Sequence, residues 1–395
     1  MASRWWREPN ASTTLSLWCA RDFCNNLAGR WIVLANRILA EVDETIVIDI
    51  HTMRPDKQAC PKTLHKIPFG IEFKNWIKIR IYALITKILA RSITPNYSPN
   101  VLSIWVYSHI ANGLYHFSFV KTLTNLTGLG PDDCRITTRY EPTFFSSSFF
   151  GILHEAGHGF YELGMRNEWH GLPPGTCTSL GIHESQSRFW ENMVGRSRAF
   201  WDWCLPRAQQ HFPGSLGDVE PGEIYFAVNA VKPSLIRVEA DEVTYNLHII
   251  IRFELEQAMI AGDLVAADLP AAWNQKYQDS LGITPPDDAD GVMQDIHWSA
   301  GLIGYFPTYS LGNLYAAQFL AAASAELGDI DEMVGQGQFE PLQEWMGRNI
   351  HHHGQCFSAA ELVTRASGQP LSHQPLVNYL KNKLLPLYGL APEPA

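Results

Sequence analysis

The chain has 395 residues, of which 46% are hydrophobic and 18% are charged, and its formal net charge is −10. This ordinary globular balance excludes an intrinsically disordered chain, and the length suggests two or three domains. The 7 cysteines form no Cys-x-x-Cys pair, which argues against a thiolate zinc site or a disulfide scaffold and favours a reducing compartment.

Charge distribution and the first residues limit the partners that we expect. The acidic excess lies in residues 126–395, which argues against a nucleic-acid surface there. Residues 101–120 contain no Asp, Glu, Lys or Arg, but their His, Asn and Ser favour a buried segment over a membrane span. The start of the chain lacks the layout of a secretory signal. We therefore expect a cytoplasmic protein without a nucleic-acid or membrane partner.

Residues 1–125 contain candidate secondary structure but no motif that carries chemistry. Apolar residues recur at helical spacing over 15–44 and 76–90, and residues 45–50 have the pattern of a short strand. Residues 94–100 contain two prolines and predict a turn or linker.

The pattern changes after residue 127. A turn is expected at 128–131, and a strand is expected over 132–140. Gly128 and Gly130 are not expected to form a nucleotide-binding loop, because no helix with a further glycine follows them. Ser146, Ser147 and Ser148 are expected to cap the helix that follows. Helices are predicted over 149–164, 183–200, 243–260, 311–327, 358–365 and 374–384, with a loop over 167–178.

The first of these helices carries the motif His-Glu-x-x-His. His154 and His158 are four residues apart, so on a helix both imidazoles face one point, and Glu155 can reach a water molecule bound there. A catalytic zinc ion requires a third protein ligand and one open position. Glu184 near the start of the next predicted helix is the natural third donor, which gives a His2Glu site suited to peptide hydrolysis.

These motifs belong to a set of six sequence blocks that resembles one family. The chain from about residue 128 to 388 is similar to the carboxypeptidase Taq family of thermostable metallocarboxypeptidases. The blocks are Asp133-x-Arg135-x-Thr137, His154-Glu155-x-x-His158, His183-Glu184-Ser185-Gln186, Ile236-Arg237-x-x-Ala240-Asp241, Gly291-x-x-Gln294-Asp295-x-His297-Trp298, and the run from Gly304 to Asn313.

The resemblance implies a fold and an activity. The expected fold is mainly α, a cleft-type zinc peptidase of the gluzincin class, like neurolysin and thimet oligopeptidase, with a small β element near the active site. The expected function is a metal-dependent carboxypeptidase that releases C-terminal amino acids from peptides with broad specificity. Zn²⁺ is the expected cofactor, with Co²⁺ or Mn²⁺ as alternatives, the substrates are peptides with a free C-terminus, and family members are commonly homodimers.

The N-terminal region departs from the family pattern. The family's His-Pro-Phe block is absent at 121–125, and residues 1–125 do not match the helices that roof the cleft in the family. We expect an atypical, truncated or spliced-together N-terminal region at 1–125 and the zinc carboxypeptidase catalytic region at 126–395. Two alternatives stay open, an oligopeptidase or endopeptidase on the same fold and an inactive truncated homologue.

The expected chemistry assigns a role to each motif residue. Glu155 is the general base that takes the proton of the zinc-activated water and passes it to the leaving amine. The resemblance to related peptidases suggests His297 with Tyr305 or Tyr309 as donors to the oxyanion, although each Tyr could simply be a buried phenol that needs a partner.

An exopeptidase also has to recognise a terminal carboxylate, for which an arginine fork is the best match. Arg237 and Arg135 are the candidates, and the alternative is a structural ion pair of Arg237 with Asp241 and of Arg135 with Asp133. His183, Gln294 and Asp295 are expected to orient the metal ligands. The run from His351 to His353 is not expected to bind a metal.

Overall fold

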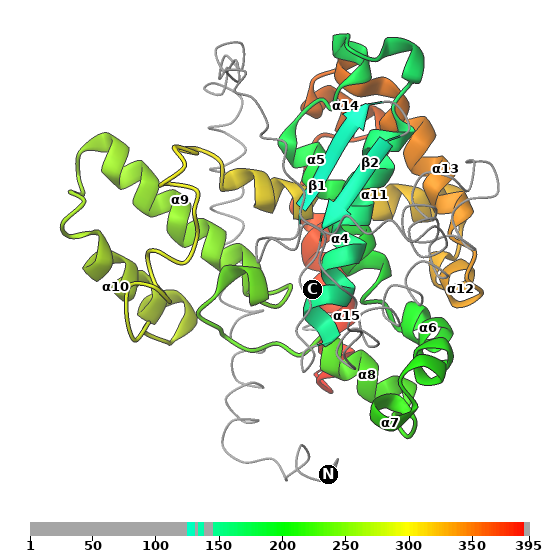
Figure 1. The fold of residues 1–395 in the computed structure, drawn as a ribbon, viewed down its shortest axis with the longest axis horizontal. Helices are drawn as coiled ribbons and strands as arrows, with labels where there is room; N and C mark the ends of the chain where they lie inside the picture. The colour runs from blue at the N-terminus through cyan, green and yellow to red at the C-terminus, as the bar shows by residue number, and fades with distance from the viewer. Residues whose placement is uncertain (1–124, 131–132, 138–144, 391–395) are drawn as a thin grey trace, which may run out of the picture.

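The computed structural model describes residues 125–130, 133–137 and 145–390. The helices predicted over 15–44 and 76–90, the strand over 45–50 and the rest of the predicted N-terminal region lie outside the described residues. The described part of the chain is mainly helical, which confirms the predicted fold class at this level (Figure 1).

The α-helices and strands follow one another along the chain with short connections. They are β1 (Asn125–Gly130), β2 (Asp133–Thr137), α4 (Phe145–Gly164), α5 (Leu180–Arg188), α6 (Arg198–His211), α7 (Pro213–Leu216), α8 (Pro221–Val228), α9 (Tyr245–Ala261), α10 (Leu269–Leu281), α11 (Pro307–Leu327), α12 (Ile330–Gly335), α13 (Glu340–Asn349), α14 (Ala359–Ser367) and α15 (Gln374–Leu387). One π-helical segment, η5 (Phe189–Val194), continues directly from α5, and short 3-10 helices are η3 (Asn167–Trp169), η4 (Pro173–Gly175), η6 (Arg237–Glu239) and η7 (His351–Cys356).

Local sequence signals explain many of the helix ends. Ser179 and Ser197 cap α5 and α6, because each hydroxyl accepts a hydrogen bond from a backbone N–H three residues later. Ser358 and Glu361 form a capping box at the start of α14. Pro307 is the first residue of α11, where the missing proline N–H costs nothing.

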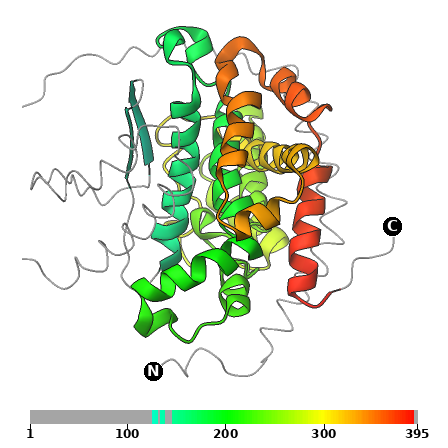
Figure 2. The same ribbon diagram turned by 90° about the vertical axis from the view of Figure 1, so that its right-hand side faces the viewer.

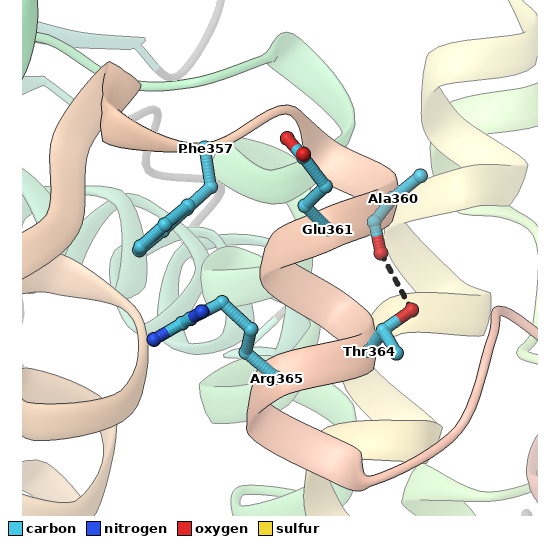
Figure 3. A pocket seen from close by; sticks show the side chains of 5 residues that line it. All are labelled: Phe357, Ala360, Glu361, Thr364 and Arg365. Atoms are coloured by element: carbon cyan, nitrogen blue, oxygen red, sulfur yellow. Dashed lines mark hydrogen bonds between the residues drawn. The ribbon is translucent and has the colours of Figure 1, made fainter.

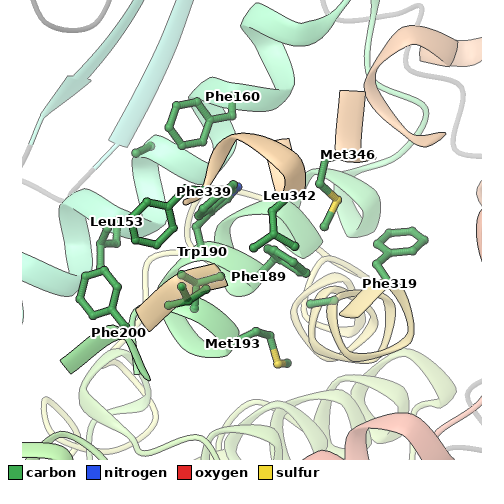
Figure 4. Close-up of a cluster of buried hydrophobic side chains, with 14 of the residues drawn as sticks. Leu153, Phe160, Phe189, Trp190, Met193, Phe200, Phe319, Phe339, Leu342 and Met346 are labelled. Atoms are coloured by element: carbon green, nitrogen blue, oxygen red, sulfur yellow. The ribbon is translucent and has the colours of Figure 1, made fainter. Parts of the chain in front are cut away.

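Helices α4, α5, α6, α11 and α13 share one large apolar core. Its side chains come from the inner faces of these helices and include many aromatic rings (Figure 4), among them Leu153, Phe160, Phe189, Trp190, Phe200, Phe319, Phe339 and Met346. Each buried aromatic side chain removes a large apolar area from water, so these rings contribute strongly to the stability of the core. The core lies directly behind the helix face that carries His154 and His158, so it fixes the position of α4.

A second, smaller core joins α9 to α10. Leu247, Ile251 and Leu255 on α9 pack against Trp273 and Tyr277 on α10. In Figure 1 these two helices project to the left of the main helical body. The loop that leads from α10 to α11 returns the chain to the main body, so residues 282–306 connect the two cores.

Strands β1 and β2 form an antiparallel hairpin that contacts α4 (Figures 1 and 2). Thr127 pairs with Arg135 in the register, and a register shift lies between Gly128 and Gly130. The strand expected over 132–140 is therefore present as β2, although the turn expected from residue 128 is wrong for Gly128 and Gly130, which belong to β1.

Several predicted helix boundaries are also wrong. Ser146 to Ser148 do not cap α4 but lie inside it, because the helix already starts at Phe145. The helix predicted over 183–200 is divided into α5, η5 and α6, with the break at Gly195 and the N-cap Ser197. The helices predicted over 311–327, 358–365 and 374–384 are present as α11, α14 and α15.

The described helices include none with the length and apolar character that a membrane crossing requires.

Candidate metal centre

Helices α4 and α5 bring the three predicted metal ligands to one point. Glu184 Oε2 lies 3.4 Å from His158 Nε2 and 3.8 Å from His154 Nε2. The three ligand atoms all lie within 4.8 Å of one another. A tetrahedral ion about 2.0–2.2 Å from each ligand atom would hold those atoms roughly 3.3–3.6 Å apart. The two distances from Glu184 lie at or near these values, so the three side chains fit a divalent ion.

Two glycines allow the close helix packing that creates this spacing. A Cβ atom on Gly157, between the two histidines, would lie 2.7 Å from the Cα atom of Ser187 on α5. A Cβ atom on Gly312 of α11 would lie 2.7 Å from Cβ of Glu184. Since real Cβ atoms do not approach this closely, only glycine lets α4 and α11 pack against the two sides of α5. This packing points Glu184 towards the histidine pair.

The electrostatic states of His158 and Glu184 also suit a cation. Burial lowers the pKa of His158 to about 4, so its imidazole is neutral at pH 7. Burial alone would raise the pKa of Glu184, but Arg188 and the two histidines outweigh it and hold that pKa well below its usual range. A neutral imidazole and an ionised carboxylate are the forms that bind a metal ion.

Each histidine has a partner that fixes its orientation. Nδ1 of His154 lies 2.9 Å from Oε2 of Glu191, and Nδ1 of His158 lies 3.0 Å from the backbone carbonyl oxygen of His183. Both partners are acceptors, so these contacts favour the tautomers with the proton on Nδ1, which would leave each Nε2 lone pair for a metal ion. The side chain of His183 also packs against His158, with 2.6 Å between their Nδ1 atoms. The predicted orienting role of His183 rests on these contacts.

Arg188 and Glu191 take part in the centre although the sequence analysis did not identify them. Arg188 Nε donates to Glu184 Oε1 at 2.7 Å, and Arg188 Nη1 donates to Glu191 Oε2 at 3.2 Å. The spacings of 4 and 3 residues along the chain put the three side chains on one helix face. In the sequence, Arg188 follows the third ligand Glu184 by four residues, and Glu191 follows Arg188 by three. This alternation of acidic and basic residues is the signal from which Arg188 and Glu191 could have been predicted.

Glu155 is buried beside His154 on α4. Glu155 is 5% exposed, and burial raises the pKa of its carboxyl group from 4.5 to about 7. A carboxyl group with a pKa near neutrality exchanges protons readily at the pH of the cell. Its place on α4 and its proton affinity both suit a general base.

His297, Tyr305 and Tyr309 lie together just before and within the first turn of α11. Nε2 of His297 lies 2.9 Å from the hydroxyl oxygen of Tyr309, and the rings of His297 and Tyr305 are 5.3 Å apart. Burial, with the nearby Arg237, lowers the pKa of His297 to about 4, and burial raises the pKa values of both phenols. All three groups are therefore neutral at pH 7 and able to donate hydrogen bonds.

Arg237 is paired with Asp295 and not with Asp241. Its Nε and Nη2 atoms donate to the two carboxylate oxygens of Asp295 at 2.9 and 3.0 Å. Asp241 instead accepts hydrogen bonds from the backbone N–H groups of Val243 and Thr244 just before α9. The predicted Arg237–Asp241 pair is therefore wrong, because the start of a helix already uses that carboxylate.

The other predicted residues lie in different surroundings. Asp295 contacts Arg237 and Arg252, and Gln294 Oε1 accepts a hydrogen bond from the backbone N–H of Arg237 at 2.8 Å. These two residues therefore hold arginines where we expected them to orient metal ligands. Arg135 lies in β2 of the hairpin that packs on α4. Its roles in substrate binding and in a pair with Asp133 remain predictions.

A surface pocket of about 370 Å³ lies away from these residues. It is lined by Phe357, Ala360, Glu361, Thr364 and Arg365, at the start and along one side of α14 (Figure 3). The guanidinium of Arg365 stacks over the ring of Phe357 at 4.2 Å. None of the candidate site residues lines this pocket, so we do not assign the chemistry to it.

Comparisons with known proteins give one consistent family. A family model described as carboxypeptidase Taq (M32) metallopeptidase matches residues 125–384. The chain is 55% identical over 261 residues to thermostable carboxypeptidase 1 of Thermus thermophilus, which covers 66% of this chain and 51% of that protein. It is 43% identical over 264 residues to carboxypeptidase 1 of Bacillus subtilis, covering 67% of this chain and 53% of the relative.

A solved structure has a similar fold. The crystal structure of the M32 carboxypeptidase from Deinococcus radiodurans R1 has a TM-score of 0.68 and 38% sequence identity, and the match covers 81% of this chain and 68% of that one. The chain spans about half the length of the curated relatives that it matches.

Proposed function

Because the chain belongs to the carboxypeptidase Taq (M32) family of metallopeptidases, as its motifs predict, we propose that it is a zinc-dependent carboxypeptidase. It would release C-terminal amino acids from peptides with broad specificity. The observation that carries the proposal is the convergence of His154, His158 and Glu184, with Glu184 Oε2 3.4 and 3.8 Å from the two histidine nitrogens. Two neutral nitrogens and one carboxylate oxygen are the donor set of catalytic zinc in peptidases.

The residues around the ligands support a hydrolytic mechanism. Zinc, when bound, polarises the scissile carbonyl and lowers the pKa of a water molecule towards neutrality. Glu155 takes the proton of the attacking water and passes it to the leaving amine. The high pKa of the buried Glu155 carboxyl supports this role, because the group can both accept and return a proton near pH 7.

His297, Tyr305 and Tyr309 supply donors for the oxyanion. Their proton-carrying groups are neutral at pH 7, so they do not repel a cation at the neighbouring ligands. The Tyr309 hydroxyl and His297 Nε2 are 2.9 Å apart, which orients both groups. Preorganised donors in a water-poor site are an effective way to stabilise developing negative charge.

We assign the terminal carboxylate of the peptide to Arg237, with Arg135 as the second candidate. Asp295 holds the Nε and Nη2 atoms of Arg237. The guanidinium carries five N–H donors, so Nη1 and Nη2 keep further N–H groups that can bind a carboxylate ligand. A fixed fork of this kind loses little side-chain entropy when it binds a carboxylate.

The wider expectations extend this proposal. We propose a cleft-type gluzincin fold of the neurolysin kind, and contacts of β2 with α4 support a β element near the metal centre. Zn²⁺ is the proposed ion, and Co²⁺ or Mn²⁺ suit the same ligands. A homodimer, a cytoplasmic location and the absence of nucleic-acid and membrane partners remain predictions.

The test is release of amino acids from a matched pair of peptides. The zinc-loaded chain should release residues one at a time from the C-terminus of an unblocked peptide and leave the C-terminally amidated peptide intact. Glu155→Gln serves as the control for contaminating peptidases. Equal cleavage of both peptides would instead indicate an endopeptidase, and the absence of cleavage by a zinc-loaded chain would contradict the proposal.

A further inference from the structure

The hydroxyl group of Tyr245 lies between two buried arginines. It accepts a hydrogen bond from Arg188 Nη2 at 2.5 Å and from Arg237 Nη1 at 2.9 Å. Tyr245 is the first residue of α9 and is 3% exposed. Tyr245 takes no part in the proposed chemical steps, and its hydroxyl bonds to neither the metal ligands nor the proposed oxyanion donors.

On one side, this hydroxyl completes the surroundings of Arg188. The Nε atom of Arg188 holds Glu184, its Nη1 atom holds Glu191, and its Nη2 atom reaches Tyr245. The guanidinium also stacks over the Tyr245 ring at 4.2 Å. Each of its three nitrogens therefore has a partner, which leaves the planar group a single orientation. That orientation directs Glu184 Oε1 away from the metal position and leaves Oε2 for the ion.

On the other side, the same hydroxyl completes the surroundings of Arg237. Asp295 holds Nε and Nη2, and the Tyr245 hydroxyl is the acceptor for Nη1, so each nitrogen of this buried guanidinium has a partner. The arrangement is similar to that of Arg188, with two nitrogens held by carboxylates and the third by the phenol. A continuous chain of contacts of 2.5 to 3.0 Å thus runs from Asp295 through Arg237, Tyr245 and Arg188 to Glu184.

We propose that Tyr245 is a positioning residue whose single hydroxyl fixes both the arginine behind the third metal ligand and the arginine assigned to the terminal carboxylate. This inference rests on the proposed metallocarboxypeptidase function. It adds to that function that metal binding and substrate recognition both depend on Tyr245. This residue would contact neither the ion nor the peptide.

Tyr245→Phe tests the link directly. Phenylalanine keeps the ring that stacks on Arg188 but leaves one N–H of each arginine without its acceptor, and a buried N–H without a partner is costly. We expect the zinc dissociation constant, measured by chelator competition, to rise about tenfold, at the lower end of the effect of residues that orient metal ligands. The visible spectrum of the Co²⁺-loaded variant should also change, because Glu184 is less constrained.

The same variant should affect substrate recognition. KM for a peptide with a free C-terminal carboxylate should rise by about tenfold, since Arg237 keeps its contact with Asp295 but its Nη1 atom loses the acceptor on Tyr245. The change in kcat should be smaller than the change in KM. Tyr388→Phe is the matched control. The Tyr388 hydroxyl accepts a hydrogen bond from the backbone N–H of Val231 at 2.6 Å and not from Arg188 or Arg237. Its loss should therefore affect stability but neither zinc affinity nor KM.

The outcomes separate this inference from the proposed function. If Tyr245→Phe keeps the zinc affinity, Co²⁺ spectrum and KM of the wild type, or changes only one side of the link, the inference is wrong. If the wild-type chain binds no zinc or releases no amino acid, the proposed function fails first. A zinc-loaded and active wild type is therefore the condition under which the variant is measured, and the melting temperature of both variants reports whether they fold.

Discussion

Replacing Glu155 by glutamine should abolish turnover while it stabilises the metal-free protein. Glutamine has nearly the shape of glutamate but cannot accept the proton of the attacking water. We expect kcat to fall by about 10²- to 10⁴-fold, the usual contribution of a general base. Glu155 does not belong to the three groups that face the metal position, so the variant should still bind one zinc ion.

The stabilisation follows from the burial of the carboxyl group. Burial raises the pKa of Glu155 from 4.5 to about 7. At about 1.4 kcal/mol for each pKa unit, ionised Glu155 costs the folded, metal-free chain about 3 kcal/mol. The sign is fixed by linkage, because the folded chain holds its proton to higher pH than the unfolded chain. Stability is therefore lost as pH rises from 4.5 to 7, and the full cost is present above pH 7.

The assay is denaturant unfolding of both proteins in excess chelator at several pH values. Below pH 4.5 the free energies of unfolding should be similar, and at pH 8 Glu155→Gln should be more stable by about 3 kcal/mol. A variant that is no more stable than the wild type at pH 8 would show that the Glu155 carboxylate is not desolvated. Retained turnover would remove Glu155 from the role of the base.

Two further substitutions test the substrate contact and the helix packing. Arg237→Ala should raise KM for free-carboxylate peptides at least tenfold, about the value of a charged hydrogen bond. The inhibition constant of the amidated peptide, measured as a competitor, should change less, and equal effects on both would leave Arg237 only its structural pair with Asp295. Gly157→Ala should force α5 away from α4 at Ser187 and weaken zinc binding at least tenfold. Gly214→Ala is its control, since no atom lies within 4 Å of an added Cβ there. If chelator competition gave the same zinc affinity for both variants, the packing argument would be wrong.

The metal ligands could be predicted because their positions depend mostly on local rules. His154 and His158 share a helix face by their spacing alone, and the family blocks point to Glu184 on the next helix. The structure brings the three ligand atoms within 4.8 Å of one another. The close approach of α4 to α5 could not be predicted from the sequence. It depends on Gly157, which lies against Ser187 and leaves no room for a side chain.

The spacing of Arg188 and Glu191 from Glu184 is local, but the partners that the orienting residues take from distant segments could not be predicted, because tertiary packing selects them. Local reasoning paired Arg237 with Asp241, only four residues away, whereas its partner Asp295 lies 58 residues further along the chain. The role of Glu191 depends on the π-helical segment that follows α5 and on the docking of α4 against it. Tyr245 becomes visible only when Arg188 and Arg237 are seen on either side of it. Such long-range choices have no signature in helical periodicity.

The central claim, that His154, His158 and Glu184 hold one divalent ion, is tested most directly by zinc titration of the wild type and Glu184→Ala. We expect the wild type to bind one zinc ion per chain in competition with a chelator, and the variant to lose the ion to the same chelator, because two imidazoles alone form an under-coordinated site. A wild type that binds no zinc, or a Glu184→Ala variant that keeps the wild-type affinity, would contradict the account.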